Sequence, residues 1–184
     1  GAGDGAGAGG GRRRRRYYRK TMRPSSAQLA ALGLRDGRNT ITFTVHSALQ
    51  GTQLVSSTVW QFGRATRLVV SDVDGTITKS DVLGQLMPRV GLDWAHGGVT
   101  SLYSQITKQG YQMLYLTARG IGMATTTRDY LSSVQQGEHT LPIGPCLLSP
   151  SRLIESFTRE VIRRKPEEFK IAALCDIRSL SPPT

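Results

Sequence analysis

The architecture of this chain is clearest in residues 67 to 78, which read Arg67-Leu-Val-Val-Ser-Asp-Val-Asp-Gly-Thr-Ile-Thr78. The stretch opens with an apolar run, residues 68 to 70, of the kind that a buried strand of a parallel sheet shows. It ends in two carboxylates, Asp72 and Asp74, and turns at Gly75. This pattern predicts an α/β protein with a ligand site at the carboxyl edge of its sheet.

The two carboxylates indicate both a metal and a reaction. Asp72 and Asp74 are two positions apart, so on an extended chain they point the same way. Their charges would repel unless a cation lay between them, and a hard oxygen site suits Mg²⁺. Asp72 could then attack phosphorus, while Asp74 protonates the leaving oxygen and activates water. Gly75 allows close backbone approach, and the hydroxyl of Thr76 could fix the pair. The alternative is a turn that two Asp residues merely cap.

A second predicted strand, residues 111 to 116, ends beside the same edge of the sheet. It is followed by Thr117, whose hydroxyl could donate a hydrogen bond to a phosphoryl oxygen. Arg119 has two possible roles: it could hold phosphate bidentately, or it could pair with an acid at the sheet edge. Further along, residues 153 to 164 have helical spacing of apolar positions, and residues 166 to 180 also read as a helix.

Several blocks of the sequence occur in the order of a known family. They are Ser71–Gly84, Asp93-Trp94, Gly98-Val99, Gly110–Arg119, Leu141–Pro145, Leu148–Pro150, Arg159–Ile162 and Pro166–Lys170. With them the chain resembles the lipin family of Mg²⁺-dependent phosphatidate phosphatases, which belongs to the haloacid dehalogenase-type phosphotransferase superfamily. The resemblance covers about residues 19 to 182.

The resemblance implies a fold and a function. The fold would be a Rossmann-like, haloacid dehalogenase-type parallel sheet, preceded by a small β module that is half of an immunoglobulin-like unit. The reaction would be Mg²⁺-dependent hydrolysis of phosphatidic acid to diacylglycerol and phosphate, through an aspartyl-phosphate on Asp72, in glycerolipid metabolism. Thr117, Gly75 and Arg119 would contact the phosphate. Lys170 would be the motif's lysine and would neutralise phosphate and nucleophile, with Lys165 as its competitor.

The same resemblance implies partners and a location. We expect peripheral binding to an anionic membrane, in the cytoplasm at the endoplasmic reticulum, with the nucleus as a second possible place. An N-terminal lipin segment is expected as a partner in the full-length protein, and no specific nucleic acid is expected. Two other functions stay open. One is a non-catalytic phosphatidate-binding module, which need not retain Asp72, Asp74 and Thr76 together. The other is a phosphatase of soluble substrates, which would not explain the lipin-like blocks.

The chain divides into three predicted parts. Residues 1 to 24 are a Gly- and Arg-rich arm that we expect to be disordered, because they offer no apolar area to bury. Residues 25 to 64 form a β-hairpin module, with alternating apolar residues in 40 to 45 and a second strand in 54 to 60. A two-stranded module must pack on the next domain or on another segment. Residues 65 to 184 are the catalytic domain.

The charge and the composition of the chain bear on its binding partners, on membrane insertion and on metal binding. Residues 1 to 23 hold eight Lys or Arg against one acid, a net +7, which leaves +4 of the total +11 for the rest of the chain. The Arg run could bind anionic lipid or nucleic acid or serve nuclear import, or it could be only a solvated tail. No run approaches the ~20 apolar residues of a membrane-spanning helix. The two cysteines, Cys146 and Cys175, lack the spacing of a zinc site.

The end of the sequence gives one more expectation. The lipin family continues into another strand and a Gly-Asn-Arg block with a downstream Asp that completes the metal site, whereas this sequence stops at Thr184. We therefore interpret the chain as C-terminally truncated. We expect the strand that bears Asp72 to have one unpaired edge, and the chain alone to hydrolyse phosphatidate poorly or not at all.

Overall fold

The structure is a computed structural model, and it describes residues 24–79, 95–150 and 166–180. The protein has two compact units, residues 1–34 and residues 35–184. In the first, the described element is α1, Ser26–Ala31. It begins with a capping box, because Ser25 Oγ accepts from the Gln28 amide at 3.3 Å and Gln28 Oε1 accepts from the Ser25 amide at 2.8 Å. The predicted arm lies outside the described residues except for Pro24.

The second unit opens with the predicted hairpin. Strands β1, Gly37–Ser47, and β2, Gly51–Gln61, pair antiparallel, and both are longer than the sequence predicts. The turn is tied by Ser47 Oγ, which accepts from two amides, and it ends at Gly51, whose φ of +67° favours glycine. Phe43 lies opposite Val55 in this register.

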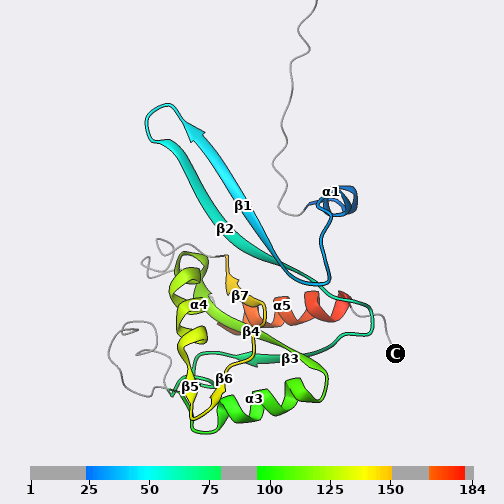
Figure 1. The fold of residues 1–184 in the computed structure, drawn as a ribbon, viewed down its shortest axis with the longest axis vertical. Coiled ribbons are helices and arrows are strands. Elements are labelled where there is room, and N and C mark those ends of the chain that lie inside the picture. Colours follow the sequence, from blue (N-terminus) through cyan, green and yellow to red (C-terminus); the bar gives the residue numbers. More distant parts are fainter. Residues whose placement is uncertain (1–23, 80–94, 151–165, 181–184) are drawn as a thin grey trace, which may run out of the picture. The chain divides into compact units, whose positions relative to one another are not determined.

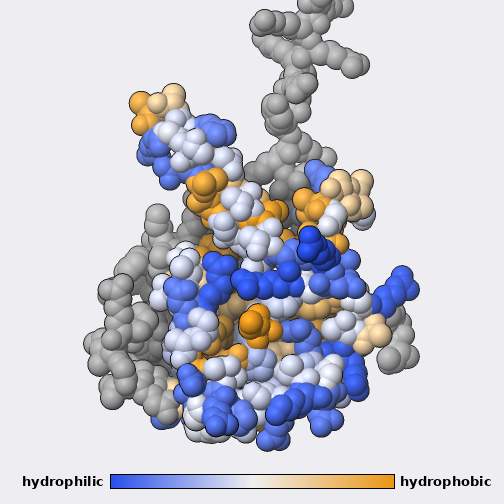
Figure 2. Space-filling view, in the orientation of Figure 1, coloured by the Kyte–Doolittle hydropathy of each residue, from blue (hydrophilic) through white to orange (hydrophobic). Residues whose placement is uncertain are grey.

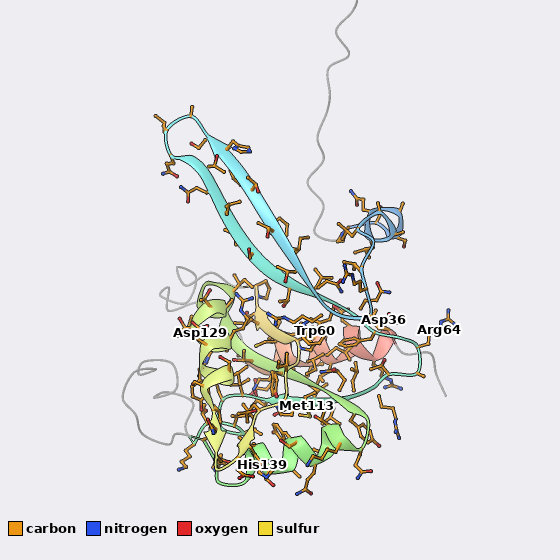
Figure 3. All side chains as sticks on the ribbon, in the orientation of Figure 1. Asp36, Trp60, Arg64, Met113, Asp129 and His139 are labelled. Atoms are coloured by element: carbon orange, nitrogen blue, oxygen red, sulfur yellow. The ribbon has the colours of Figure 1, made fainter. Side chains whose placement is uncertain are left out.

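The apolar face of the hairpin is open along its outer half. Phe43, Val45 and Val55 are each more than half exposed. Figure 2 shows hydrophobic side chains on the surface of the hairpin. The sequence predicts that this face packs on the following domain or on another segment, and the described residues do not cover it. At the opposite end, Trp60 and Phe62 stack with their ring centroids 5.9 Å apart, and Trp60 lies at the base of the hairpin in Figure 3.

The predicted parallel sheet follows and confirms the α/β class. Its strands are β3, Arg67–Asp72, β4, Tyr111–Gly120, and β7, Cys146–Ser149, in the order β3-β4-β7, and both pairings are parallel. Within the described residues β3 lies at the edge of this sheet, as we expect from the sequence. Strand β4 runs past the predicted end at residue 116, because β7 pairs with Leu116 and Thr117 and, after a register shift, with Gly120.

Helices connect and cover the strands. The crossover from β3 to β4 contains α3, Val99–Lys108, and the crossover from β4 to β7 contains η1, Ile121–Met123, α4, Ala124–Ser133, and the short pair β5, Gln135–Gln136, and β6, His139–Thr140. The predicted helix of residues 166 to 180 is α5, Pro166–Leu180, whereas the predicted helix of residues 153 to 164 lies outside the described residues. None of the described helices combines the length and apolar character that crossing a bilayer requires.

Two neighbouring residues of β3 show that α3 and α5 lie on opposite faces of the sheet. Successive side chains of a strand point to opposite faces. The Ser71 hydroxyl is 2.6 Å from the Tyr103 hydroxyl of α3, whereas Asp72 contacts Lys170 of α5 at 2.6 Å. Figure 1 shows the two helices on either side of β3 and β4.

The hydrophobic core fills the face that α3 and α4 cover. Met113 of β4 is fully buried there and is labelled among the packed side chains of Figure 3. The other members of this cluster are Val73, Ile77, Ala95, Val99, Tyr103, Tyr115, Leu131, Val134 and Leu141. Because the core sits directly behind the carboxyl ends of β3 and β4, it holds the backbone of both strands at the edge where the acids lie.

The start of α3 depends on a residue from the β5–β6 pair. Its N-cap, Gly98, supplies no side chain to the free amides of the first turn. Gln136 takes this place, since its Oε1 accepts from the Thr100 hydroxyl at 3.2 Å and from the Thr100 amide at 3.5 Å, while its Nε2 donates to the His96 carbonyl at 2.8 Å. A side chain 36 residues away therefore caps the helix.

Candidate active site

The acid pair lies in a tight turn at the carboxyl end of β3. Asp72 is the last residue of the strand, and the chain then folds back so that the amides of Ile77 and Thr78 donate to the Val73 carbonyl at 2.9 and 3.0 Å. Gly75 has a φ of +82°, which an L side chain rarely adopts. The turn thus keeps Asp72 and Asp74 together at the sheet edge that the sequence predicts.

Asp72 is open on one side and held on the other. Its Oδ1 accepts from the amide of Val73 at 2.9 Å, and its Oδ2 accepts from Nζ of Lys170 at 2.6 Å. The Asp72 side chain is 31% exposed and that of Lys170 is 28% exposed, so a ligand from solvent can reach both. Lys170 lies where the sequence expects the neutralising cation, and its competitor Lys165 lies outside the described residues.

Asp74 is enclosed by hydrogen bonds from β4. Thr117 Oγ1 donates to its Oδ2 at 2.7 Å, while Nε and Nη2 of Arg119 both donate to its Oδ1, at 3.0 and 2.6 Å. The Asp74 side chain is 11% exposed and that of Arg119 is 1% exposed. Of the two roles considered for Arg119, the described geometry is the pairing with an acid. Its contact with phosphate stays a prediction, as does that of Thr117.

The hydroxyl that fixes the turn is not the predicted one. Thr76 is exposed and makes no side-chain hydrogen bond to any residue that the structure describes. Instead Thr78, which is 1% exposed, accepts from the Gly75 amide at 3.1 Å and reaches the Val73 carbonyl at 3.4 Å. Thr78 therefore fixes the turn among the described residues, because the fold-back of the turn directs this second threonine inward. A role of Thr76 in the reaction stays a prediction.

Sequence reasoning also missed the support behind Arg119. Thr127 of α4 is fully buried, and its hydroxyl accepts from Nη1 of Arg119 at 3.5 Å. Thr127 belongs to a run of three threonines in the sequence, and a polar run in a helix offers no signal that one member faces a buried guanidinium. The contact becomes visible only when α4 is placed against β4.

The described residues support a metal site less strongly than the pair of acids in the sequence suggests. Each carboxylate already has its own cation, Lys170 for Asp72 and Arg119 for Asp74, so repulsion between the two acids does not by itself demand a metal. Among the described residues no three His, Cys, Asp or Glu side chains gather as metal ligands. Asp72, which is partly exposed, fits a hard cation; both oxygens of Asp74 are already engaged. A Mg²⁺ site at Asp72 and Asp74 stays a prediction.

Two other ionisable groups near the site are kept neutral by burial. Burial raises the pKa of Cys146 to about 11, with Arg119 and Arg128 opposing the rise. Burial likewise raises the pKa of Tyr115, whose hydroxyl donates to the Pro142 carbonyl at 2.6 Å. Neither group offers an anion at neutral pH.

The fold and the site together define a parallel α/β protein with a carboxylate–cation site at the carboxyl edge of its sheet, consistent with the predicted haloacid dehalogenase-type fold. Residues 20–184 match the model of the family LNS2 (Lipin/Ned1/Smp2), and the chain belongs to this family. The resemblance to lipins that the sequence suggests is thereby confirmed.

Three relatives show how much of their length this match covers. Phosphatidate phosphatase LPIN2 of Homo sapiens is 47% identical over 167 residues, which are 91% of this chain and 19% of that protein. Phosphatidate phosphatase PAH1 of Arabidopsis thaliana is 50% identical over 163 residues, 89% of this chain and 18% of that protein. Phosphatidic acid phosphohydrolase 1 of Saccharomyces cerevisiae is 47% identical over 163 residues, which are 89% of this chain and 19% of that protein. The chain thus spans about a fifth of the length of these curated relatives.

Proposed function

We propose that this chain is the catalytic part of a phosphatidate phosphatase, which hydrolyses phosphatidic acid to diacylglycerol and phosphate. One observation carries the proposal. The partly exposed carboxylate of Asp72 lies beside Lys170, and the enclosed carboxylate of Asp74 lies next to it in the same turn. Relatives of the family that are named phosphatidate phosphatases support the choice of substrate.

The two carboxylates divide the chemistry between them. An oxygen of Asp72 attacks phosphorus, the bond from phosphorus to the diacylglycerol oxygen breaks, and Asp74 gives that oxygen its proton. Water then attacks the aspartyl-phosphate, Asp74 takes a proton from the water, and phosphate leaves as the Asp72 carboxylate is restored. Lys170 neutralises negative charge on Asp72 and on the approaching phosphate. The difference in exposure supports this division, because the nucleophile must meet the substrate.

Mg²⁺ is part of the proposal. Asp72 would hold it together with a ligand outside the described residues, and its charge would neutralise the phosphate oxygens in the transition state. The described residues also allow a cation-assisted reaction without further acids, since Lys170 already contacts the nucleophile. Dependence of turnover on added Mg²⁺, measured before and after chelation, tests this part separately.

Two further parts of the proposal concern the surroundings of the chain. Its substrate is a membrane lipid, so we place the protein at an anionic surface such as the cytoplasmic face of the endoplasmic reticulum. The formal net charge of +11 supports this attraction. The open apolar face of the hairpin, around Phe43 and Val55, supports packing of an N-terminal lipin segment onto it in the full-length protein.

The experiment measures phosphate release from phosphatidate in mixed detergent micelles with Mg²⁺. It uses this chain alone and a chimera in which the chain replaces the matching 167 residues of human LPIN2. We expect slow or no turnover by the chain alone, which spans about a fifth of the length of these relatives, and clear turnover by the chimera. Asp72→Asn should abolish the turnover, and Asp129→Asn on α4, a matched change away from the acid pair, should leave it intact.

Three outcomes are informative. A folded chimera that releases no phosphate, beside an active LPIN2, would contradict the proposed function. Fast turnover by the chain alone would support the function and overturn the expected inactivity of the chain alone. Binding of the chain to phosphatidate vesicles without turnover in either protein would favour the non-catalytic phosphatidate-binding module instead.

A further inference from the structure

Arg119 is buried where an incoming phosphate would need it exposed. Its side chain is 1% exposed, and its nitrogens are already engaged by Asp74 and Thr127. An arginine that grips a substrate phosphate presents free donors to the solvent side of a site. We infer that Arg119 is a positioning residue that holds the carboxylate of Asp74, and that it does not bind phosphate. This inference deepens the proposed function and rests on it.

The two carboxylates of the site are held in different ways. Asp74 is bound at both oxygens, by Thr117 on Oδ2 and by Arg119 on Oδ1. Both donors come from β4, two residues apart, and the Arg119 amide also donates to Thr117 Oγ1 at 3.1 Å. Asp72 is held by one backbone amide and by a lysine on another element. The structure therefore leaves the nucleophile accessible and fixes the plane of the neighbouring carboxylate.

Helix α4 secures the guanidinium from behind. Thr127 is fully buried and accepts from Nη1 of Arg119, the nitrogen that does not contact Asp74. With Nε and Nη2 on the carboxylate and Nη1 on the helix, the planar guanidinium has little freedom to turn. The position of Asp74 thus depends on a chain of contacts that runs from α4 through Arg119 to the turn after β3.

A fixed carboxylate matters most for a poor leaving group. The alkoxide of diacylglycerol needs a proton as it departs, and proton transfer requires the donor oxygen within hydrogen-bond reach of the leaving oxygen. A 4-nitrophenolate leaves without that help. If Arg119 acts by placing Asp74, its loss should slow the hydrolysis of phosphatidate far more than that of 4-nitrophenyl phosphate. If it bound phosphate, both substrates would suffer alike.

The kinetic test uses Arg119→Gln and Arg119→Lys, in the chain or in the LPIN2 chimera, whichever turns over. We expect Arg119→Gln to lower kcat for phosphatidate about 100-fold, the cost of a misplaced catalytic group. The KM and the inhibition by inorganic phosphate should stay within about twofold, kcat for 4-nitrophenyl phosphate should fall less than about fivefold, and Arg119→Lys should recover part of the loss. Arg128→Gln on α4 is the matched control, because Arg128 donates to the Ala124 carbonyl and touches neither acid.

Other kinetic results would overturn the inference. A raised KM with weaker phosphate inhibition at unchanged kcat would make Arg119 a phosphate ligand. Equal losses with both substrates would remove the link to the leaving group. If neither the chain nor the folded LPIN2 chimera releases phosphate from either substrate, the proposed function fails and the catalytic role of Arg119 fails with it.

A second measurement does not need turnover. Thermal unfolding of this chain is followed for Arg119→Gln, Asp74→Asn and the double variant. Because the two side chains form a buried pair, we expect the fall in Tm of the double variant to be clearly smaller than the sum of the falls of the two single variants. Additive losses would show that the pair is not coupled in solution and would overturn the inference. If the pair is coupled but the wild-type protein is inactive, the contact between Arg119 and Asp74 exists and only the proposed function fails.

Discussion

Gly144 lies where the chain passes closest to the central strand β4, and its replacement by alanine tests the packing directly. A Cβ at this position would overlap the carbonyl oxygen of Met113 and lie 2.9 Å from its carbon. A Cβ essentially never lies within 3.0 Å of a backbone atom, so one of the two segments must shift. The segment cannot shift freely, because Tyr115 donates to the Pro142 and Pro145 carbonyls at 2.6 and 2.8 Å.

The size of the effect follows from this overlap. Forcing one extra carbon into a packed interior costs about 1–3 kcal/mol, and more when backbone has to move. A clash with the carbonyl of Met113 and the disturbed hydrogen bonds of Tyr115 place Gly144→Ala at about 3 kcal/mol or above. For a chain of this size each kcal/mol lowers Tm by about 2–4 °C. We therefore expect a fall in Tm of about 6–12 °C.

The assay is thermal unfolding followed by circular dichroism, with Gly63→Ala as the matched control. A Cβ on Gly63 would meet only the Thr66 hydroxyl, at 3.8 Å, so this variant should melt within about 2 °C of the wild type. If Gly144→Ala also melted within about 2 °C, the close approach of this segment to β4 would be refuted.

Three further changes test the site and its support. Lys170→Met removes the cation beside the nucleophile and should lower phosphate release about 100-fold, while Tm moves little because the pair is partly exposed; equal turnover would contradict the role. Gln136→Ala uncaps α3 and should cost about 1–2 kcal/mol in thermal unfolding, whereas the exposed Gln135→Ala should cost almost nothing. Because burial raises the pKa of Cys146 to about 11, its thiolate is scarce below that pH. Iodoacetamide at pH 8, followed by mass spectrometry, should modify the exposed Cys175 first, and the reverse order would refute this.

Local patterns were sufficient for much of the fold. The apolar run before Asp72 predicts β3, and the alternation in residues 40 to 45 predicts β1, because burial of one strand face leaves a direct trace in the sequence. The position of Lys170 was predicted through the resemblance to lipins, and the structure brings it to Asp72 from 98 residues away. In each case a few neighbouring residues, or a motif, carry the information.

The partners of Asp74 depended on the tertiary structure. Arg119 could equally have served a phosphate, and only the parallel register of β3 with β4 brings its guanidinium onto a carboxylate 45 residues earlier. Thr78 replaced Thr76 for a similar reason, since the fold-back of the turn decides which hydroxyl points inward.

The amino-acid sequence was thus enough to establish the α/β class, the acid pair and the family, because these follow from residue types at short spacing. Which acid is open and which is enclosed was decided by packing. Exposure depends on every element that covers a side chain, and α4 and α5 come from segments far from Asp72 and Asp74 in the chain.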